Sequence, residues 1–311
     1  MIARRDFIGG LVATAAAAAA LFPFRSLAQS RTRLVLLGTS GGPRVTAKGR
    51  AKPATLIVAN GIPYVVDCGD GVALQLARAG VPLDTLRYIF ITHHHSDHNL
   101  GYGNLIYAAW AAGLRKPVDT YGPPPLAAMT DSYWQLNRFD IETRIADEGR
   151  VDPRKLVTAH EFDAPGVVMQ SADVKVSATR VRHPPIMQAY AYRFDTADRS
   201  IVISGDTAYS PELIELAKGA DVLVHEAMHL GGLENLLKRV PNAATLREHL
   251  LASHTTTEEI GKVATAAGVK TVVLSHLVPS DDASLTDELW AEDVRRHFSG
   301  RIIVGRDLME I

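Results

Sequence analysis

The sequence has one cysteine, almost no net charge and no apolar run long enough to cross a bilayer. Because Cys68 stands alone, an internal disulfide is excluded, and we expect a small, buried, apolar side chain there. The formal net charge of −1 does not attract a polyanion, whose binding depends on clustered Lys and Arg, so no nucleic-acid partner is expected. The 47% of hydrophobic residues suffice for the core of one large or two medium domains.

The first 28 residues have the order of charged, apolar and small residues that is typical of an export signal. Arg4 and Arg5 precede an Ala-rich run over residues 9–21, which is too short and too weakly hydrophobic for a stable span. The arginine pair resembles a twin-arginine signal, which carries folded proteins. A membrane anchor is the alternative. We predict cleavage after residue 28, a periplasmic or secreted protein without stable membrane anchoring, and a mature chain 29–311 of net charge −3.

Short strand patterns alternate with helical ones from residue 33 onward. Asn60-Gly61 predicts a tight hairpin, because a type I′ turn needs positive φ. Residues 116–165 are the least regular, and we interpret them as an irregular insertion near the active-site mouth. The pattern predicts an α/β fold of two packed sheets with helices outside and a site along one edge. The expected strands are Arg33–Leu37, Thr55–Ala59, Pro63–Asp67, Tyr88–Thr92, Val174–Val181, Ala189–Phe194, Ser200–Ser204, Val222–His225 and Val272–Ser275, and the expected helices are Val72–Ala79, Asn99–Gly113, Pro211–Lys218 and Thr256–Ala267.

A histidine-rich segment directly follows the apolar strand pattern that ends at Thr92. His93 and His95 share one face of an extended backbone and can approach one ion together. Asp97 and His98 come where the chain turns into a helix, so they point elsewhere and form a second pair of ligands. Imidazole and carboxylate groups suit zinc and similar divalent ions.

Further candidate ligands stand at the ends of other expected strands. His183 follows Val174–Val181, Asp206 follows an apolar strand and a glycine, and His276 follows Val272–Ser275. Each has an ordinary alternative, such as a loop histidine or an aspartate that caps a helix. The same placement three times beside the histidine cluster predicts one shared metal site.

This set of residues resembles the motifs of the metallo-β-lactamase superfamily, in order, from about Leu34 to the C-terminus. The resemblance implies an αβ/βα four-layer sandwich with two mixed sheets and two divalent ions, usually zinc, with manganese or iron as alternatives. It implies that His93, His95 and His183 hold one ion, that Asp97, His98 and His276 hold the other, and that Asp206 bridges them. Two such ions make a shared hydroxide available near neutral pH.

Two further motifs, His225-Glu226-Ala227 and Ser253-His254-Thr255-Thr256, resemble those of ribonuclease Z-like members. That resemblance implies that His254 is a general acid facing the leaving group and that Glu226 orients it. Asp97 would orient the hydroxide besides binding metal. The alternative is that His254 is incidental and that Ser253 or Thr255 caps a helix.

Other segments resemble the arylsulfatase-type group: Leu37–Pro43, Val66–Gly71 and Arg144–Arg150. The expected function is therefore an exported hydrolase of sulfate or phosphate esters, of aryl type, with a small anionic ester as substrate. A lactonase or β-lactamase is the alternative enzyme, and a non-catalytic metal-binding protein is the third reading. The oligomeric state stays open, a homodimer being one alternative.

Asp67 and Asp70 are expected to support the metal-bound imidazoles. The candidate cations for an anionic substrate are Arg180, Arg182, Lys48, Arg50 and Lys52.

Overall fold

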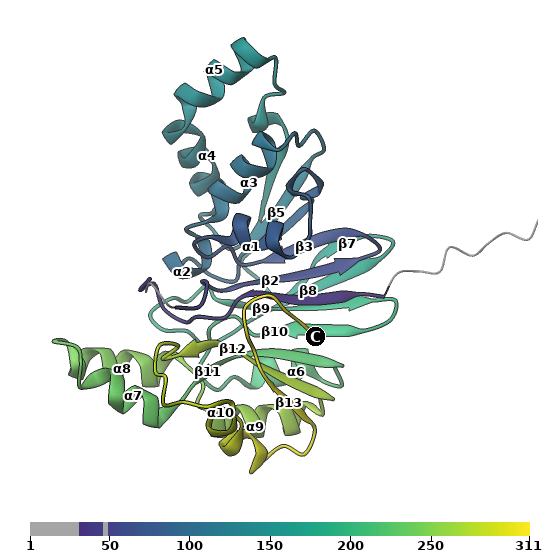
Figure 1. Ribbon diagram of the computed structural model, residues 1–311. Coiled ribbons are helices and arrows are strands. Elements are labelled where there is room, and N and C mark those ends of the chain that lie inside the picture. The colour runs from purple at the N-terminus through teal and green to yellow at the C-terminus, as the bar shows by residue number, and fades with distance from the viewer. Residues whose placement is uncertain (1–30, 46–48) are drawn as a thin grey trace, which may run out of the picture.

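The computed structural model describes residues 31–45 and 49–311, so the predicted signal segment and Lys48 lie outside the described residues. Two seven-stranded sheets pack against each other (Figure 1). In spatial order, the first contains β14 (Met309–Glu310), β1 (Arg33–Gly38), β2 (Ala54–Ala59), β3 (Ile62–Val66), β4 (Tyr88–Phe90), β5 (Val118–Gly122) and β6 (Val157–Glu161). The second contains β13 (Arg301–Val304), β12 (Thr271–Val278), β11 (Val222–Met228), β10 (Ser200–Ile203), β9 (Tyr190–Thr196), β8 (Val174–Arg180) and β7 (Gly166–Gln170).

Both sheets are mixed in the same way. In the first sheet, β1, β2 and β3 pair antiparallel and β3 to β6 pair parallel. In the second, β7 to β10 pair antiparallel and β10 to β13 pair parallel. Parallel strands send their carboxyl ends to one edge, which is where α/β sheets place their sites. The loops that follow β4, β10 and β11 therefore leave the sheets on the side of the candidate site.

Helices cover the outer face of each sheet (Figure 1). Those beside the first sheet are α1 (Val72–Arg78), α2 (Ser96–Asn99), α3 (Tyr102–Ala111), α4 (Leu126–Leu136) and α5 (Arg138–Glu148), with 3-10 turns η1 (Leu83–Thr85) and η2 (Pro153–Lys155). Those beside the second are α6 (Pro211–Ala217), α9 (Thr257–Ala267) and α10 (Asp287–Arg295). A separate pair, α7 (Leu230–Leu237) and α8 (Ala243–Ser253), projects from the body as a helical hairpin.

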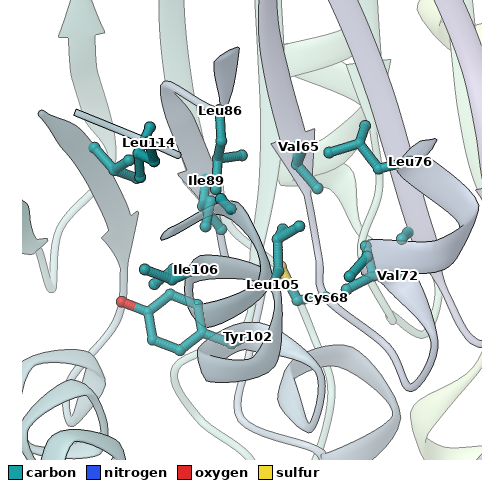
Figure 2. Close-up of a cluster of buried hydrophobic side chains, with 14 of the residues drawn as sticks. Val65, Cys68, Val72, Leu76, Leu86, Ile89, Tyr102, Leu105, Ile106 and Leu114 are labelled. Carbon is teal, nitrogen blue, oxygen red and sulfur yellow. The ribbon is translucent and has the colours of Figure 1, made fainter. Parts of the chain in front are cut away.

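Three hydrophobic layers hold this arrangement together. Between the sheets, Phe90 of β4 meets Phe194 of β9 edge to face, with ring centroids 5.2 Å apart. Outside the first sheet, the side chains of α1 and α3 pack on β3 and β4, with Cys68 fully buried among them as expected (Figure 2). A third cluster joins α6, α9 and α10 to the second sheet. The two sheets and the two outer layers of helices together form a four-layer α/β sandwich. The predicted fold is therefore confirmed.

Local predictions agree at most element positions. Asn60 and Gly61 have φ of 49° and 78°, as the predicted hairpin turn requires. The exception is residues 116–165, where the structure has β5, α4, α5 and β6 in place of an irregular insertion. The run of prolines at the start of that segment indicated irregular structure, but α4 begins directly after Pro125. Among the described residues, no helix is long and apolar enough to cross a membrane.

Candidate metal centre

The seven predicted ligands meet at one edge of the sandwich. The two sheets contribute different members, so the site depends on how they pack. His93, His95, Asp97 and His98 come from the loop after β4 and from α2, His183 follows β8, Asp206 follows β10, and His276 lies within β12. His95 is half-buried, and the other six residues are buried, with at most 6% of their surface exposed. Buried polar groups of this kind must be paired or bind an ion.

The donor atoms form two groups. In the first, His95 Nδ1 lies 3.1 Å from His93 Nε2 and 3.0 Å from His183 Nε2. In the second, Asp97 Oδ2 lies 3.3 Å from His276 Nε2 and 3.7 Å from His98 Nε2. All donors within each group lie within 4.8 Å of one another, a span that one ion can bridge.

Asp206 joins the two groups through a single oxygen. Its Oδ2 lies 3.8 Å from His93 Nε2 and 3.9 Å from His183 Nε2 on one side. On the other side it lies 3.3 Å from His98 Nε2 and 3.1 Å from His276 Nε2. His98 Nε2 is fully buried and has no hydrogen-bond partner among the described residues, so a cation beside it would satisfy its lone pair. The donor set therefore fits two divalent ions.

In three of the imidazoles, the Nδ1 atom, which does not belong to the ligand groups, contacts another protein atom. Thr92 Oγ1 lies 3.0 Å from His93 Nδ1, and the Ser253 carbonyl accepts from His183 Nδ1 at 2.9 Å. Asp67 Oδ2 lies 2.8 Å from His98 Nδ1, and Asp67 also accepts from the Thr92 backbone at 2.8 Å. Such contacts fix the ring orientation and make the facing nitrogen a better ligand. Asp67 thus has the supporting contacts expected of it, whereas Asp70 is exposed.

The electrostatics of the cluster favour cations. Burial holds the pKa of His183 at about 4 and that of His93 well below its ordinary value, so both rings are neutral and able to bind metal near pH 7. Burial also opposes a charge on His276, but Asp206 and Asp97 outweigh it and raise the pKa of His276 to about 10. The carboxylates that favour a proton on His276 would equally favour a divalent ion in its place.

His276 occupies a backbone position that the sequence pattern does not reveal. It was expected to follow a strand, but β12 continues to Val278 and His276 is an extra residue in it, with φ of 44°. A bulge of this kind redirects one side chain. Gly41 packs on the ring: a Cβ at that position would lie 2.8 Å from His276 Nδ1. Gly41 is therefore required for close approach rather than for a turn.

His254 and Glu226 lie beside the ligands, as the sequence predicts. His254 Nδ1 is 3.2 Å from Glu226 Oε1, which also accepts from the Thr255 backbone at 2.9 Å. The His254 ring stacks on His276, with centroids 5.6 Å apart and planes 17° apart. Burial lowers the pKa of His254, but the charge and hydrogen bond of Glu226 outweigh it and raise that pKa. His254 also lies close enough to Asp206 and His276 to be a third partner for an ion.

A pocket of about 410 Å³ opens onto these residues. Its floor contains His95, Asp97, Asp206, His254 and His276. The segment Gly41–Arg44 forms a rim of the pocket, and the α7–α8 hairpin forms a wall, which also contributes His249. The sequence reasoning missed Arg44 and the whole wall, although Leu246, His249 and Leu250 stand at the spacing of one helix face.

The cations predicted to meet the substrate lie elsewhere. Arg180 donates to the Asp163 carbonyl, Arg182 pairs with Glu212, and Arg50 donates to the Gly305 carbonyl. Lys52 is buried and donates to the carbonyls of the rim. None of these residues lines the pocket, whose cationic rim residue within the described chain is Arg44, 3.2 Å from Asp281.

Comparisons with known proteins agree with this geometry. The family described as "Beta-lactamase superfamily domain" matches residues 64–277. A ribonuclease Z of Mycobacterium marinum is 31% identical over 281 residues, covering 89% of this chain and 97% of that protein. One from Mycobacterium sp. (strain KMS) is 33% identical over 280 residues, covering 89% and 95%. The fold is that of the human tRNase Z, short form, with a TM-score of 0.64, 20% identity and coverage of 90% and 98%.

Two predictions are wrong in the light of these relatives. The expectation of an aryl sulfate or phosphate ester hydrolase fails, because the relatives are named ribonuclease Z and the arylsulfatase-like segments were less specific than the metal motif. The export of the chain stays a prediction. The exclusion of a nucleic-acid partner fails for the same reason. Net charge sums the whole surface, whereas a phosphodiester needs only local cations, which two metal ions and Arg44 would supply.

Proposed function

Because the chain belongs to the β-lactamase superfamily, in its metallo-β-lactamase fold, and has ribonuclease Z proteins as relatives, we propose that it hydrolyses phosphodiester bonds of RNA. The observation that carries the proposal is the His254–Glu226 pair beside the two ligand groups that share Asp206. Expulsion of a ribose oxygen benefits from a proton donor, and this buried imidazole, held by a carboxylate next to the ligand groups, is placed to be one.

His93, His95 and His183 would hold one ion and Asp97, His98 and His276 the other, with Asp206 shared. When bound, two divalent ions lower the pKa of a shared water and neutralise charge on the phosphoryl oxygens. Zinc is the expected metal for imidazole and carboxylate donors, with manganese or iron as alternatives. The protein fixes the donors in place through Asp67, Thr92 and the Ser253 carbonyl.

His254 would give its Nε2 proton to the departing oxygen as the phosphorus–oxygen bond breaks. Glu226 keeps the ring oriented, since it accepts at Nδ1 and is itself held by the backbone N–H groups of Thr255 and Thr207. The charge and hydrogen bond of Glu226 also raise the pKa of His254 in spite of burial, which favours the protonated form that a general acid requires. Asp97, besides binding metal, would orient the attacking water.

The test uses the full-length chain, loaded with Zn²⁺ or Mn²⁺ and purified beside Asp97→Ala. The substrates are a transfer RNA precursor, a single-stranded RNA, the matching DNA, a lactone and a chromogenic cephalosporin. We expect metal-dependent RNA cleavage that is lost in Asp97→Ala and after chelation. Turnover confined to the lactone or the cephalosporin would overturn the proposal and place the chain among acyl-bond hydrolases.

A further inference from the structure

One wall of the pocket is apolar although its floor is highly polar. Leu236 of α7, Val240 of the connecting turn and Leu246 and Leu250 of α8 line it together. Leu250 belongs to a small hydrophobic cluster with Leu237 that holds the α7–α8 hairpin together. Leu236, Val240 and Leu246 only partly join that cluster and keep exposed surface. The wall is therefore apolar surface that faces the pocket beside the metal ligands.

The size of the pocket limits what can occupy it. A volume of about 410 Å³ is near the lower end for small-ligand sites, which run from roughly 300 to 1,000 Å³. It can admit one unpaired nucleotide beside a phosphate, but it is too small for a base pair together with its backbones. The residues of the floor would hold the metal ions that bind the phosphate. The apolar wall is then free to contact the rest of the nucleotide.

The chemistry of the wall suits the face of a base rather than its edge. Bases are distinguished by hydrogen bonds to their edges, with Asn, Gln and Arg as the usual partners. Among the described residues that line the pocket there is no Asn or Gln, and Arg44 is paired with Asp281. The wall itself offers aliphatic groups and His249. Burial against such a surface does not use the hydrogen-bonding groups of the base edge, so it does not distinguish one base from another.

We propose that the α7–α8 wall is a base-binding subsite, which takes one unpaired nucleotide next to the scissile phosphate without selecting its identity. The inference rests on the proposed function, since it assumes that the phosphate at the metals belongs to RNA. It also accounts for a nucleic-acid substrate on a chain of nearly neutral charge. Burial of one base would add to the attraction from the metal ions and Arg44, in place of an extended basic surface.

Binding to the zinc-loaded full-length protein tests the subsite without relying on turnover. Dissociation constants are measured by calorimetry for adenosine 5′-monophosphate, uridine 5′-monophosphate and ribose 5-phosphate. We expect both nucleotides to bind at least about fivefold more tightly than ribose 5-phosphate, and to differ from each other by less than about threefold. Equal affinity for nucleotides and ribose 5-phosphate would overturn the inference, as would a tenfold preference for one base.

Variants locate the effect on the wall. Leu246→Gln should remove most of the nucleotide advantage and leave the affinity for ribose 5-phosphate unchanged. Leu251→Gln is the matched control, because Leu251 is the exposed leucine of the same helix and does not line the pocket. An unchanged advantage in Leu246→Gln would overturn the assignment to this wall. If the nucleotides bind more tightly than ribose 5-phosphate but no RNA is cleaved, the proposed function fails and the base-binding subsite stands. If RNA is cleaved but the nucleotides bind no more tightly than ribose 5-phosphate, the proposed function stands and the subsite fails.

Discussion

Glu226 holds His254 in a fixed orientation: Nδ1 of the imidazole lies 3.2 Å from Oε1 of the carboxylate. The same oxygen accepts from the Thr255 backbone at 2.9 Å, so the carboxylate is itself anchored to the residue that follows the ring. Both side chains are buried, with 6% and 3% of their surface exposed. His254 itself lines the pocket, where it can act on a leaving group or bind an ion.

His254→Ala separates these two roles. If the ring is a proton donor, its loss should lower kcat on RNA by about 10²–10⁴, because the ribose oxygen is a poor leaving group. The loss should be less than about tenfold on bis(p-nitrophenyl) phosphate, whose leaving group needs no proton. Steady-state rates on both substrates decide this. Equal losses together with a lower metal content would instead assign His254 to metal binding.

Gly41→Ala should weaken the ion held by His276. The added methyl group would lie 2.8 Å from His276 Nδ1 and 2.5 Å from Val278 Cγ2, so the ring must move. We expect the bound metal to fall from two ions toward one per chain after dialysis, measured by plasma mass spectrometry. Gly42→Ala is the control: its φ of 74° makes the change costly for the backbone, but a Cβ there meets no atom within 4 Å. Two retained ions in Gly41→Ala would contradict the assigned role.

The metal ligands were predictable because two simple rules coincide at them. Strand ends at one sheet edge lie close together, and His or Asp at several such ends suits a metal. His276 was found by these rules, although the sequence pattern did not indicate the bulge in β12 at that residue. The same reasoning failed for Arg180 and Arg182: strand alternation says which face a side chain takes, but not that Asp163 and Glu212 hold it.

The pocket wall was missed for a different reason. Residues 230–253 form α7 and α8 without packing on either sheet as a regular layer, so the strand–helix alternation gives no hint of their place. Leu246, His249 and Leu250 do mark one helix face in the sequence. What that face meets depends on the path of the hairpin over the site, which is a tertiary property that periodicity does not encode.

Lys52→Met should loosen the rim of the pocket. The buried ammonium group donates to the Gly42 carbonyl at 2.7 Å, the Arg44 carbonyl at 2.5 Å and Ser40 Oγ at 3.2 Å. Methionine fills similar space but leaves these acceptors unpaired, at a cost of about 1–3 kcal/mol in the free energy of unfolding. We expect a lower melting temperature and a raised KM. Lys262→Met, at an exposed pair with Glu258, is the control that should change neither by much.

Asp221→Asn should destabilise the protein near neutral pH but not in acid. Asp221 accepts from Lys270 Nζ at 2.6 Å and from the Ser200 backbone at 2.7 Å, and these bonds lower its pKa from 3.8 to about 2. Because the folded-state pKa lies below the unfolded one, the stabilisation is complete above about pH 4 and is lost as the pH falls toward 2. At pH 7 the variant should lose roughly 1–2 kcal/mol, allowing for partial solvent screening.

Urea unfolding of wild type and Asp221→Asn between pH 3 and 8 measures this difference directly. The gap between the two proteins should narrow steadily below pH 4, because protonation of Asp221 makes the wild type resemble the variant. Asp84→Asn serves as the control, since Asp84 is exposed on a 3-10 turn. A gap that stays constant across the whole range would mean that Asp221 stabilises β10 through hydrogen bonds that do not depend on its charge. A gap that widens in acid would contradict the depressed pKa itself.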